Sequence, residues 1–292
     1  NMSLQRSISL TEVNDTNNNK YVYMETFGNW QLANQMFQYI VLHNISKLTG
    51  RKLVIIKDKI NETPHKNLIK QHFSIMFDYI YTEDIDFDDM TSFKEPKDDL
   101  CYDEYFYDKI AKINEKYLNI EGFFQSYKYF LDTKPVEIFS LRGEYIIEIS
   151  ITFKRILDKL NIKNFNETNN LISIHIRRGD YIKYNNYHPI LPINYYIKNI
   201  NDYLNLNNLD NTNNMDNTNI TDNTKLSNKR FLIFSDDIEW CQRVFHSIKD
   251  ISYFSTNQAI TDLFLMSYCN INIISNSSFS LMAHFLNTNF NK

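Results

Sequence analysis

Three apolar segments in the second half of the chain each end in a cluster of polar residues. Residues 171–176 (Leu-Ile-Ser-Ile-His-Ile) lead into Arg-Arg-Gly-Asp, residues 231–234 (Phe-Leu-Ile-Phe) into Ser-Asp-Asp, and residues 271–274 (Ile-Asn-Ile-Ile) into Ser-Asn-Ser-Ser-Phe-Ser. Short apolar runs of this kind are typical of buried strands. Ligands of open α/β sheets bind at the carboxyl ends of the strands. The repetition therefore predicts an α/β domain with a ligand site at that edge.

Helices are predicted between and after these strands. One follows residue 237 and continues through Phe245, one covers residues 259–268, and one starts at Leu281 and continues to Leu286. Each has apolar residues at helical spacing.

A strand–helix–strand unit is predicted near the N-terminus. Residues 20–24 and 51–56 are rich in β-formers, and apolar residues at helical spacing predict a helix over 34–48. Asn34 can cap the start of this helix, and Gly50 follows its end. A unit of this kind indicates a parallel sheet.

The length of 292 residues allows one large domain or two of Rossmann size. We predict a flexible tail over 1–19, a first domain over 20–150, a connecting helix and linker over 151–170, and a second domain over 171–292. Within the middle of the chain, helices are expected at 107–118 and 146–161. Asn-rich hexads near residues 205–228 predict a disordered insertion in the second domain.

Charge and hydropathy exclude several classes of function. The chain has 31 Lys and Arg against 35 Asp and Glu, a formal net charge of −4, so no global basic field favours nucleic acid. An anion site must therefore be local. No apolar stretch approaches the roughly 18 residues of a membrane span, and the N-terminus has no signal-peptide pattern. We expect a soluble, cytoplasmic protein.

Arg177 and Arg178 follow the first of the three strands. Two guanidinium groups offer planar forks of donors that suit the oxygens of a diphosphate. Both reach one ligand only if the strand has already turned, which Gly179 permits. The alternative is that one arginine forms a structural ion pair, for example with Asp180. His175, on the same strand, is as a lone histidine more often a core residue than a catalyst.

The polar clusters after the other two strands have two interpretations each. Hydroxyl groups and free N–H groups over residues 275–280 form an anion site, whereas Ser278 or Ser280 alone would be an ordinary helix cap. A carboxylate of Asp236 or Asp237 can accept hydrogen bonds from the amine edge of guanine, but this cluster can equally cap the next helix.

These segments resemble the α-1,2-fucosyltransferase family, glycosyltransferase family 11. Its members carry a His-x-Arg-Arg-x-Asp element, and residues 175–181 read His-Ile-Arg-Arg-Gly-Asp-Tyr. Residues 34–39, 121–126, 235–240 and 262–280 resemble further motifs of that family, in the same order. Five matches in sequence make the resemblance specific.

The resemblance implies a fold of the glycosyltransferase-B type, in which two Rossmann-like domains face each other across a cleft. It implies GDP-β-L-fucose as the donor and a glycan or oligosaccharide as the acceptor. Transfer would invert the donor to an α-linked product, such as an α-1,2 linkage on a terminal galactose, without a metal or other cofactor. The second domain would bind the donor and the first would lie on the acceptor side.

The resemblance also implies roles for individual residues. Arg177 would stabilise charge on the departing β-phosphate. Arg178 would assist it or anchor Asp180, which is a candidate base by position or a support for an arginine. The donor-binding set comprises His175, Arg177, Arg178, Asp236, Asp237, Ser277, Ser278 and Phe279. The set expected to reach the cleft from the acceptor side comprises Asn34, Gln35 and Gln125.

Some positions depart from the family pattern. Gln31 and Ala33 stand where glycines are usual, and Leu281 and Met282 replace two tryptophans. His284 stands where a small residue is usual. The resemblance places these positions next to the donor site, at the acceptor and in the packing of the helices.

Three other functions are alternatives to this one. Residues 84–86 and 86–88 have the Asp-x-Asp form that metal-dependent glycosyltransferases use to hold Mn²⁺ or Mg²⁺. A catalytically inactive relative would bind a nucleotide or carbohydrate without turnover. A protein O-fucosyltransferase shares the arginine logic but usually enters the secretory pathway.

Overall fold

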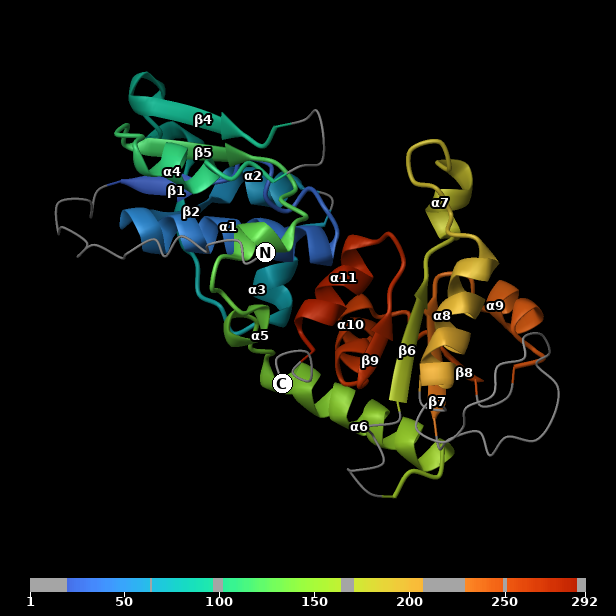
Figure 1. Cartoon of the computed structure of the whole chain (residues 1–292). Coiled ribbons are helices and arrows are strands. Elements are labelled where there is room, and N and C mark those ends of the chain that lie inside the picture. Colours follow the sequence, from blue (N-terminus) through green and yellow to red (C-terminus); the bar gives the residue numbers. More distant parts are fainter. Residues whose placement is uncertain are drawn as a thin grey trace. The chain divides into compact units, whose positions relative to one another are not determined.

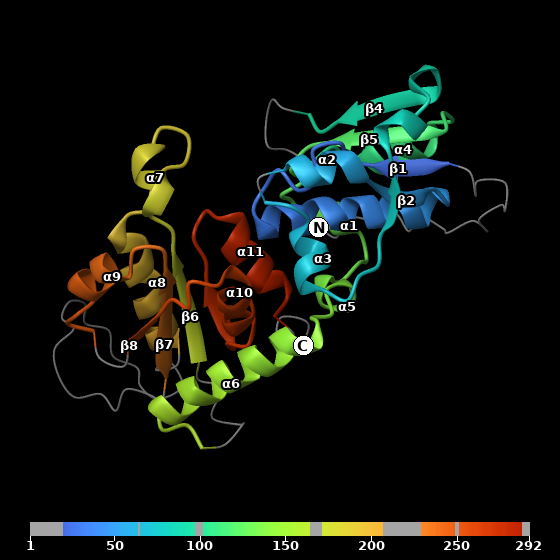
Figure 2. The same cartoon turned by 180° about the vertical axis from the view of Figure 1, so that it is seen from behind.

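The structure is a computed structural model that describes residues 20–63, 65–96, 102–163, 171–206, 229–248 and 251–287. The chain forms two compact units, Asn1–Arg142 and Gly143–Lys292 (Figures 1 and 2). The predicted tail over 1–19 lies outside the described residues. So does the predicted insertion, apart from residues 205–206, which end a helix.

The first unit contains a sheet of five parallel strands in the order β3-β2-β1-β5-β4. The strands are β1 (Tyr21–Tyr23), β2 (Lys52–Ile56), β3 (Asp78–Ile80), β4 (Met90–Lys94) and β5 (Tyr117–Glu121). The helices are α1 (Leu32–Thr49), α2 (Lys57–Glu62), α3 (Leu68–His72), α4 (Phe106–Ala111) and α5 (Pro135–Ile138). Short 3₁₀ turns are η2 (Thr82–Asp84), η3 (Phe87–Asp89) and η4 (Tyr127–Phe130). The chain order reverses between β1 and β5, which makes that junction the topological switch point of the sheet.

Helix α1 follows β1 and is buried along most of its length. It begins before the predicted start, after Gln31, whose side chain makes no capping bond. Asn34 is therefore not the cap. Gly50 ends the helix as predicted, with a φ of 70° and an N–H bond to the carbonyl of Ser46. Glycine suits this left-handed position because it has no Cβ.

The predicted helix over 107–118 is confirmed only in its first part, because it ends at Ala111. Residues Phe106–Ala111 are helical, but Tyr117–Glu121 form a buried central strand, β5. The run Tyr-Leu-Asn-Ile-Glu is short and apolar, and a run of that length fits a buried strand as well as a helix. Pairing with β1 and β4 decided the outcome.

The second unit contains four parallel strands in the order β8-β7-β6-β9. They are β6 (Leu171–Ile176), β7 (Arg230–Ser235), β8 (Ile251–Phe254) and β9 (Ile271–Ile273). The helices are α6 (Gly143–Lys159), α7 (Gly179–Lys183), α8 (Ile193–Leu206), α9 (Ile238–Val244), α10 (Ala259–Ser267) and α11 (Ser278–Phe285). The three apolar segments of the sequence are thus three of these strands, and β8 was not predicted.

The two faces of the second sheet are covered by different helices. Ile172, Ile174 and Ile176 point from β6 into a core that includes Tyr196 of α8 and Phe245 beside α9. Figure 1 shows α8 and α9 on one side of β6 and α10 and α11 on the other. Since successive side chains of a strand alternate between faces, His175 points toward the α11 side.

Helix α6 belongs to the second unit. Phe153 of α6 contacts Tyr268, just beyond α10, with ring centroids 5.4 Å apart. The division between the units falls at Arg142, so α6 as a whole follows it, whereas the predicted boundary at 150 cuts this helix. In the part of the chain that the structure describes, no helix is both long and apolar enough to cross a membrane.

Candidate functional site

The carboxyl ends of β6, β7 and β9 bring the three polar clusters to one edge of the second sheet. Ile176 pairs with Ser235 across β6 and β7, and Ile174 pairs with Ile273 across β6 and β9. Strands β7 and β9 flank β6 on opposite sides, so the junction of β6 and β9 is the switch point of this sheet. Three groups therefore surround the position where such sheets bind ligands. They are the two arginines Arg177 and Arg178, the aspartates Asp236 and Asp237, and residues 275–280, here called the serine segment.

His175 joins the ends of β6 and β9. Its Nδ1 lies 2.8 Å from Ser275 Oγ, and its ring centroid lies 5.5 Å from that of Phe279. Both His175 and Ser275 are buried. Burial, and next the positive charge of Arg177, lower the pKa of His175 to about 3. The imidazole is consequently neutral near pH 7 and cannot act there as a charged phosphate ligand.

Arg177 is held between two carboxylates. Its Nη2 lies 2.8 Å from Asp180 Oδ1, and its Nη1 lies 2.9 Å from Asp236 Oδ2. The guanidinium also lies 5.5 Å from the ring centroid of Tyr181. The Arg177 side chain keeps 23% exposure, so solvent still reaches it.

Arg178 is directed toward β7 and α9. Its Nε bonds Asp237 Oδ2 at 3.1 Å, its backbone N–H donates to Asp236 Oδ1 at 2.9 Å, and its guanidinium stacks 3.9 Å from the Trp240 ring centroid. The expectation that Arg178 anchors Asp180 is wrong, because Arg177 holds that carboxylate. Asp180 lies in the first turn of α7, three residues after Arg177, which precedes the helix.

Asp237 has the helix-capping role that was one of its two predicted alternatives. Its Oδ1 accepts the N–H of Trp240 at the start of α9, while Oδ2 accepts from Arg178. Both oxygens are thus engaged within the protein. Two arginines face three aspartates here, so the cluster carries one formal negative charge.

Gly179 allows a close approach rather than a left-handed turn. A Cβ at this position would lie 2.5 Å from Asp236 Oδ2. Its φ is not positive, in contrast to those of Gly28, Gly50 and Gly122. The absence of a side chain lets α7 begin directly against the Asp236 carboxylate that orients Arg177.

Some side chains of the serine segment make internal hydrogen bonds, and others are partly exposed at the start of α11. Ser277 caps α11 by accepting the N–H of Phe279. The predicted caps were Ser278 and Ser280, and neither has this role. Ser280 is buried and donates to the carbonyl of Ser277. Ser277, Ser278 and Phe279 are half-buried at the start of α11, where helix N–H groups are oriented outward.

One set of contacts was not predicted. Tyr181 donates its hydroxyl to the carbonyl of Asn276 at 3.1 Å and stacks on His188 with centroids 4.9 Å apart. Asn276 in turn donates to the carbonyl of Pro189 at 2.7 Å. These contacts tie the segment around α7 to the serine segment, across a separation in sequence that no local pattern reveals.

In the first unit, Asn34 and Gln125 meet at the switch point. Gln125 Nε2 donates to Asn34 Oδ1 at 2.8 Å, and Gln125 follows β5, the strand next to β1. Gln35 differs from expectation. It is fully buried, donates to the carbonyls of Trp30 and Lys66, and accepts the N–H of Leu68. It supports the loop before α3 and does not reach solvent.

The turn before Gln125 is fixed by an acidic side chain. Glu95 Oε2 accepts the N–H groups of Phe123 and Phe124, both at 2.8 Å. Gly122 has a φ of 152°, and a Cβ on it would lie 2.5 Å from Glu95 Cβ. This glycine is therefore required by both conformation and space.

The two Asp-x-Asp segments are local turns. Asp84 Oδ2 accepts the N–H of Tyr81 at the start of η2, and Asp86 Oδ1 accepts the N–H of Asp88 in η3.

The chain belongs to glycosyltransferase family 11. Residues 3–291 match the sequence pattern of the family described as Glycosyl transferase family 11. Among curated proteins, an alpha-1,2-colitosyltransferase of Escherichia coli is 30% identical over 198 residues, which is 64% of this chain. That match spans 59% of the length of the colitosyltransferase. The O-antigen biosynthesis glycosyltransferase WbnK of Escherichia coli is 26% identical over 289 residues, 88% of each chain.

Solved fucosyltransferases share the fold. NodZ alpha-1,6-fucosyltransferase from Bradyrhizobium, soaked with GDP-fucose, aligns with a TM-score of 0.51 at 12% identity, over 91% of this chain and 92% of that one. A mutant of Arabidopsis thaliana FUT1 in complex with GDP aligns with a TM-score of 0.51 at 11% identity, over 92% of this chain and 69% of that one. The two parallel α/β units therefore form a fold like that of glycosyltransferase-B enzymes.

Proposed function

We propose that this glycosyltransferase transfers L-fucose from GDP-β-L-fucose to a hydroxyl group of an acceptor glycan, with inversion to an α-linked product. We propose an α-1,2 linkage to a terminal galactose or a related sugar. The observation that carries the proposal is Arg177, fixed between Asp180 and Asp236 at the carboxyl edge of the second sheet. Membership in family 11 and the names of the relatives support fucose or a close analogue as the sugar.

Arg177 is the group best placed to assist departure of GDP. As the bond from the anomeric carbon to the phosphate oxygen breaks, negative charge grows on the β-phosphate. A fixed guanidinium stabilises that charge more than the ground state, which is the condition for catalysis. We infer that Asp180 is the partner of Arg177 that the diphosphate displaces, because the Asp180 side chain is 48% exposed and the Asp236 side chain only 26%. The diphosphate would take the place of Asp180 beside Nη2, and Asp236 would keep Arg177 in position.

The rest of the donor site follows from the same edge of the sheet. The N-terminal end of α11, with Ser277, Ser278 and Phe279, would line the nucleotide, since helix N–H groups favour anions. Neutral His175 would support this segment through Ser275. Asp236 and Asp237 orient the arginines, so reading of guanine by either carboxylate would use lone pairs that these bonds leave free.

The acceptor is assigned to the first unit. In this proposal the two units face each other across a cleft, with Asn34 and Gln125 on the acceptor side. Gln35 acts behind them by holding the loop of Lys66. Transfer would need neither a metal nor another cofactor, because the guanidinium groups supply the positive charge that Mn²⁺ or Mg²⁺ supplies elsewhere.

The proposal is tested by incubating the protein with GDP-fucose and an array of acceptors with terminal galactose or N-acetylglucosamine, with and without EDTA. We expect GDP release that depends on a galactose acceptor and survives EDTA. Loss of activity with EDTA and recovery with Mn²⁺ would favour the metal-dependent alternative. GDP binding without turnover on any acceptor would favour an inactive relative.

A second candidate is transfer of colitose, which is L-fucose without the 3-hydroxyl group. The alpha-1,2-colitosyltransferase among the relatives favours it. The two candidates differ only at the sugar, so the same assay with GDP-fucose and GDP-colitose at equal concentration separates them. A site that hydrogen-bonds the 3-hydroxyl would discriminate strongly against colitose. A higher kcat/KM for GDP-colitose would replace fucose in the proposal.

A further inference from the structure

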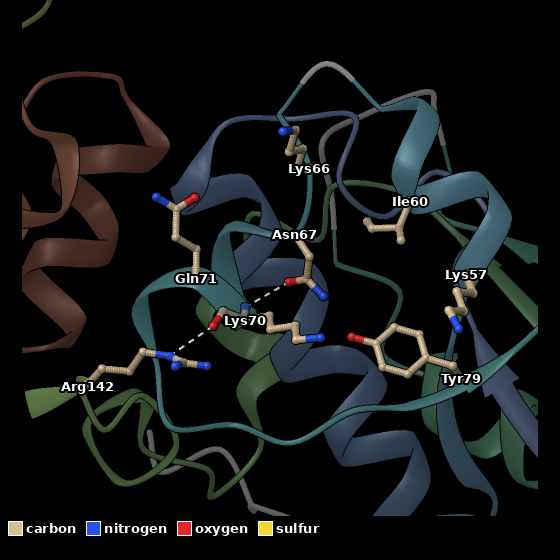
Figure 3. Close-up of a pocket in the computed structure, with 8 residues that line it drawn as sticks. All are labelled: Lys57, Ile60, Lys66, Asn67, Lys70, Gln71, Tyr79 and Arg142. Carbon is tan, nitrogen blue, oxygen red and sulfur yellow. Dashed lines mark hydrogen bonds between the residues drawn. The ribbon is translucent and has the colours of Figure 1, made fainter.

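The first unit contains a basic pocket that the donor site does not use. It has a volume of about 780 Å³ and lies beside the carboxyl end of β2, between α2, α3 and β3 (Figure 3). Four of its lining residues are basic, Lys57, Lys66, Lys70 and Arg142. None of the described residues that line it is acidic. This concentration of positive charge stands out in a chain whose net charge is −4.

Within the described part of the chain, the positive charges of the pocket have no carboxylate partner. Among the described residues, none of the four basic side chains forms a salt bridge. Lys57 donates to the Tyr81 hydroxyl, and the Lys70 ammonium lies 5.0 Å from the Tyr79 ring centroid. Aromatic contacts of this kind leave the full positive charge available to an anion.

Hydrogen bonds between side chains and the backbone fix the segments that line the pocket. Arg142 Nε donates to the carbonyls of Lys70 and Phe73, which orients its guanidinium. Gln35, buried behind the pocket, bonds the carbonyl of Lys66 and the N–H of Leu68. Gln35 thereby fixes the loop that carries Lys66, and Arg142 fixes the turn of α3 that carries Lys70.

Asn67 adds a hydrogen-bond donor without an acceptor. Its Oδ1 caps α3 by accepting the N–H of Lys70. Its Nδ2 is buried and has no partner in the described part of the chain. Figure 3 shows this amide and the Lys70 ammonium pointing toward Tyr79. An unsatisfied buried donor is costly, and an acceptor supplied by a ligand or water would offset the cost.

We propose that this pocket binds an acidic sugar, that is, a glycan residue that carries a carboxylate or a phosphate. The volume is in the range of small-molecule sites and exceeds what a simple inorganic anion fills. The cationic groups are spread around the pocket, and Tyr79, Asn67 and Gln71 supply neutral polar groups for sugar hydroxyls. That this sugar belongs to the acceptor rests on the proposed function. Its binding to the pocket does not.

The test measures binding of glucuronic acid and glucose 1-phosphate to the full chain by calorimetry at low salt, with glucose and inorganic phosphate for comparison. The acidic sugars are expected to bind, glucose is not, and inorganic phosphate should bind at least about tenfold more weakly, equivalent to about 1.4 kcal/mol. Equal binding of inorganic phosphate and glucose 1-phosphate would show a site for anions and overturn the sugar assignment.

Three variants localise the binding. Lys70→Met removes a charge whose side chain contacts only the Tyr79 ring among its described contacts. Asn67→Asp keeps the cap of α3, since aspartate caps as well as asparagine, but replaces the free donor by a negative charge. Both should weaken acidic-sugar binding about tenfold or more. Lys128→Met, an exposed lysine over Tyr102 in the same unit, should not change it.

Saturating GDP separates this proposal from the donor site. Acidic-sugar binding should persist with GDP bound, and GDP affinity should be unchanged in Lys70→Met. Displacement of the acidic sugar by GDP would place it in the nucleotide site. Unchanged acidic-sugar affinity in both pocket variants would likewise overturn the proposal, whatever the outcome of the transfer assay.

Discussion

His175 Nδ1 lies 2.8 Å from Ser275 Oγ, and this hydrogen bond joins the carboxyl ends of β6 and β9. It crosses the switch point of the second sheet, where neighbouring strands separate and ligands bind. Because the imidazole is buried and lies near Arg177, its neutral form is favoured. A neutral histidine adds no charge below the arginines, and it connects the Arg-Arg segment with the serine segment.

This neutral histidine should make stability depend on pH. The unfolded chain protonates His175 near its ordinary pKa of 6.5, whereas the folded protein does so only at about 3. Between those values the unfolded state binds more protons, so the free energy of unfolding falls as pH falls. Replacing His175 by Asn, whose amide can bond Ser275 Oγ, should reduce that fall.

The measurement is urea unfolding of both proteins at about pH 7 and about pH 5, within the window of this titration. The wild type should lose more stability than His175→Asn between these conditions. An equal loss in both proteins would mean that other groups, such as the half-buried His43 and His284, determine the acid sensitivity.

Replacement of Arg177 by alanine should abolish transfer while the protein stays folded. A lost donor of the oxyanion-hole type costs about 2.7–4 kcal/mol of transition-state stabilisation. We expect kcat to fall at least about a hundredfold. Arg243→Ala, an exposed arginine on α9, is the matched control and should keep wild-type activity. Retention of more than about a tenth of the activity by Arg177→Ala, under 1.4 kcal/mol, would falsify the assignment.

The two carboxylates beside Arg177 should have unequal effects. Asp236 contacts both Arg177 and the backbone N–H of Arg178, whereas Asp180 contacts only Arg177 among these groups. Asp236→Asn should therefore lower kcat/KM more than Asp180→Asn. Because Asp180→Asn removes a negative charge that competes with the diphosphate, it should raise GDP affinity. Titration with GDP and steady-state kinetics of both variants provide the comparison, and weaker GDP binding by Asp180→Asn would contradict the exchange of partners.

Gly122→Ala should destabilise the first unit. The added Cβ meets Glu95 Cβ at 2.5 Å, and the φ of 152° is strained for alanine. Strain of this kind costs about 1–3 kcal/mol. Gly143→Ala is the control, because nothing lies within 4 Å of a Cβ there and the position begins α6. Denaturation midpoints should fall for Gly122→Ala and stay or rise for Gly143→Ala; equal midpoints for the two variants would exclude strain at Gly122.

Sequence patterns identified the elements that carry the site because those elements are local. The strands at 171–176, 231–234 and 271–274 consist mostly of apolar residues, and each ends where charged or hydroxyl side chains begin. The helix after Asp237 and the end of α1 at Gly50 follow from capping chemistry in neighbouring residues. Family motifs added the class of enzyme, which local physics alone does not supply.

Errors arose where two local patterns are compatible with one sequence. Residues 117–121 fit either a helix or a strand, and only pairing with β1 and β4 makes them a strand. Gln35 lies in a motif segment expected at the cleft, yet packing turns its side chain inward to the loop of Lys66. The direction of a side chain depends on neighbours distant in sequence.

The sequence by itself determined that two arginines, two adjacent aspartates and a serine segment follow strands of a parallel sheet. Only the tertiary structure decided their pairing: Arg177 with Asp180 and Asp236, Arg178 with Asp237, and His175 with Ser275. It also brought together Lys57, Lys70 and Arg142 in one pocket. Strand order sets these pairs, and strand order is a property of long-range packing that no single segment encodes.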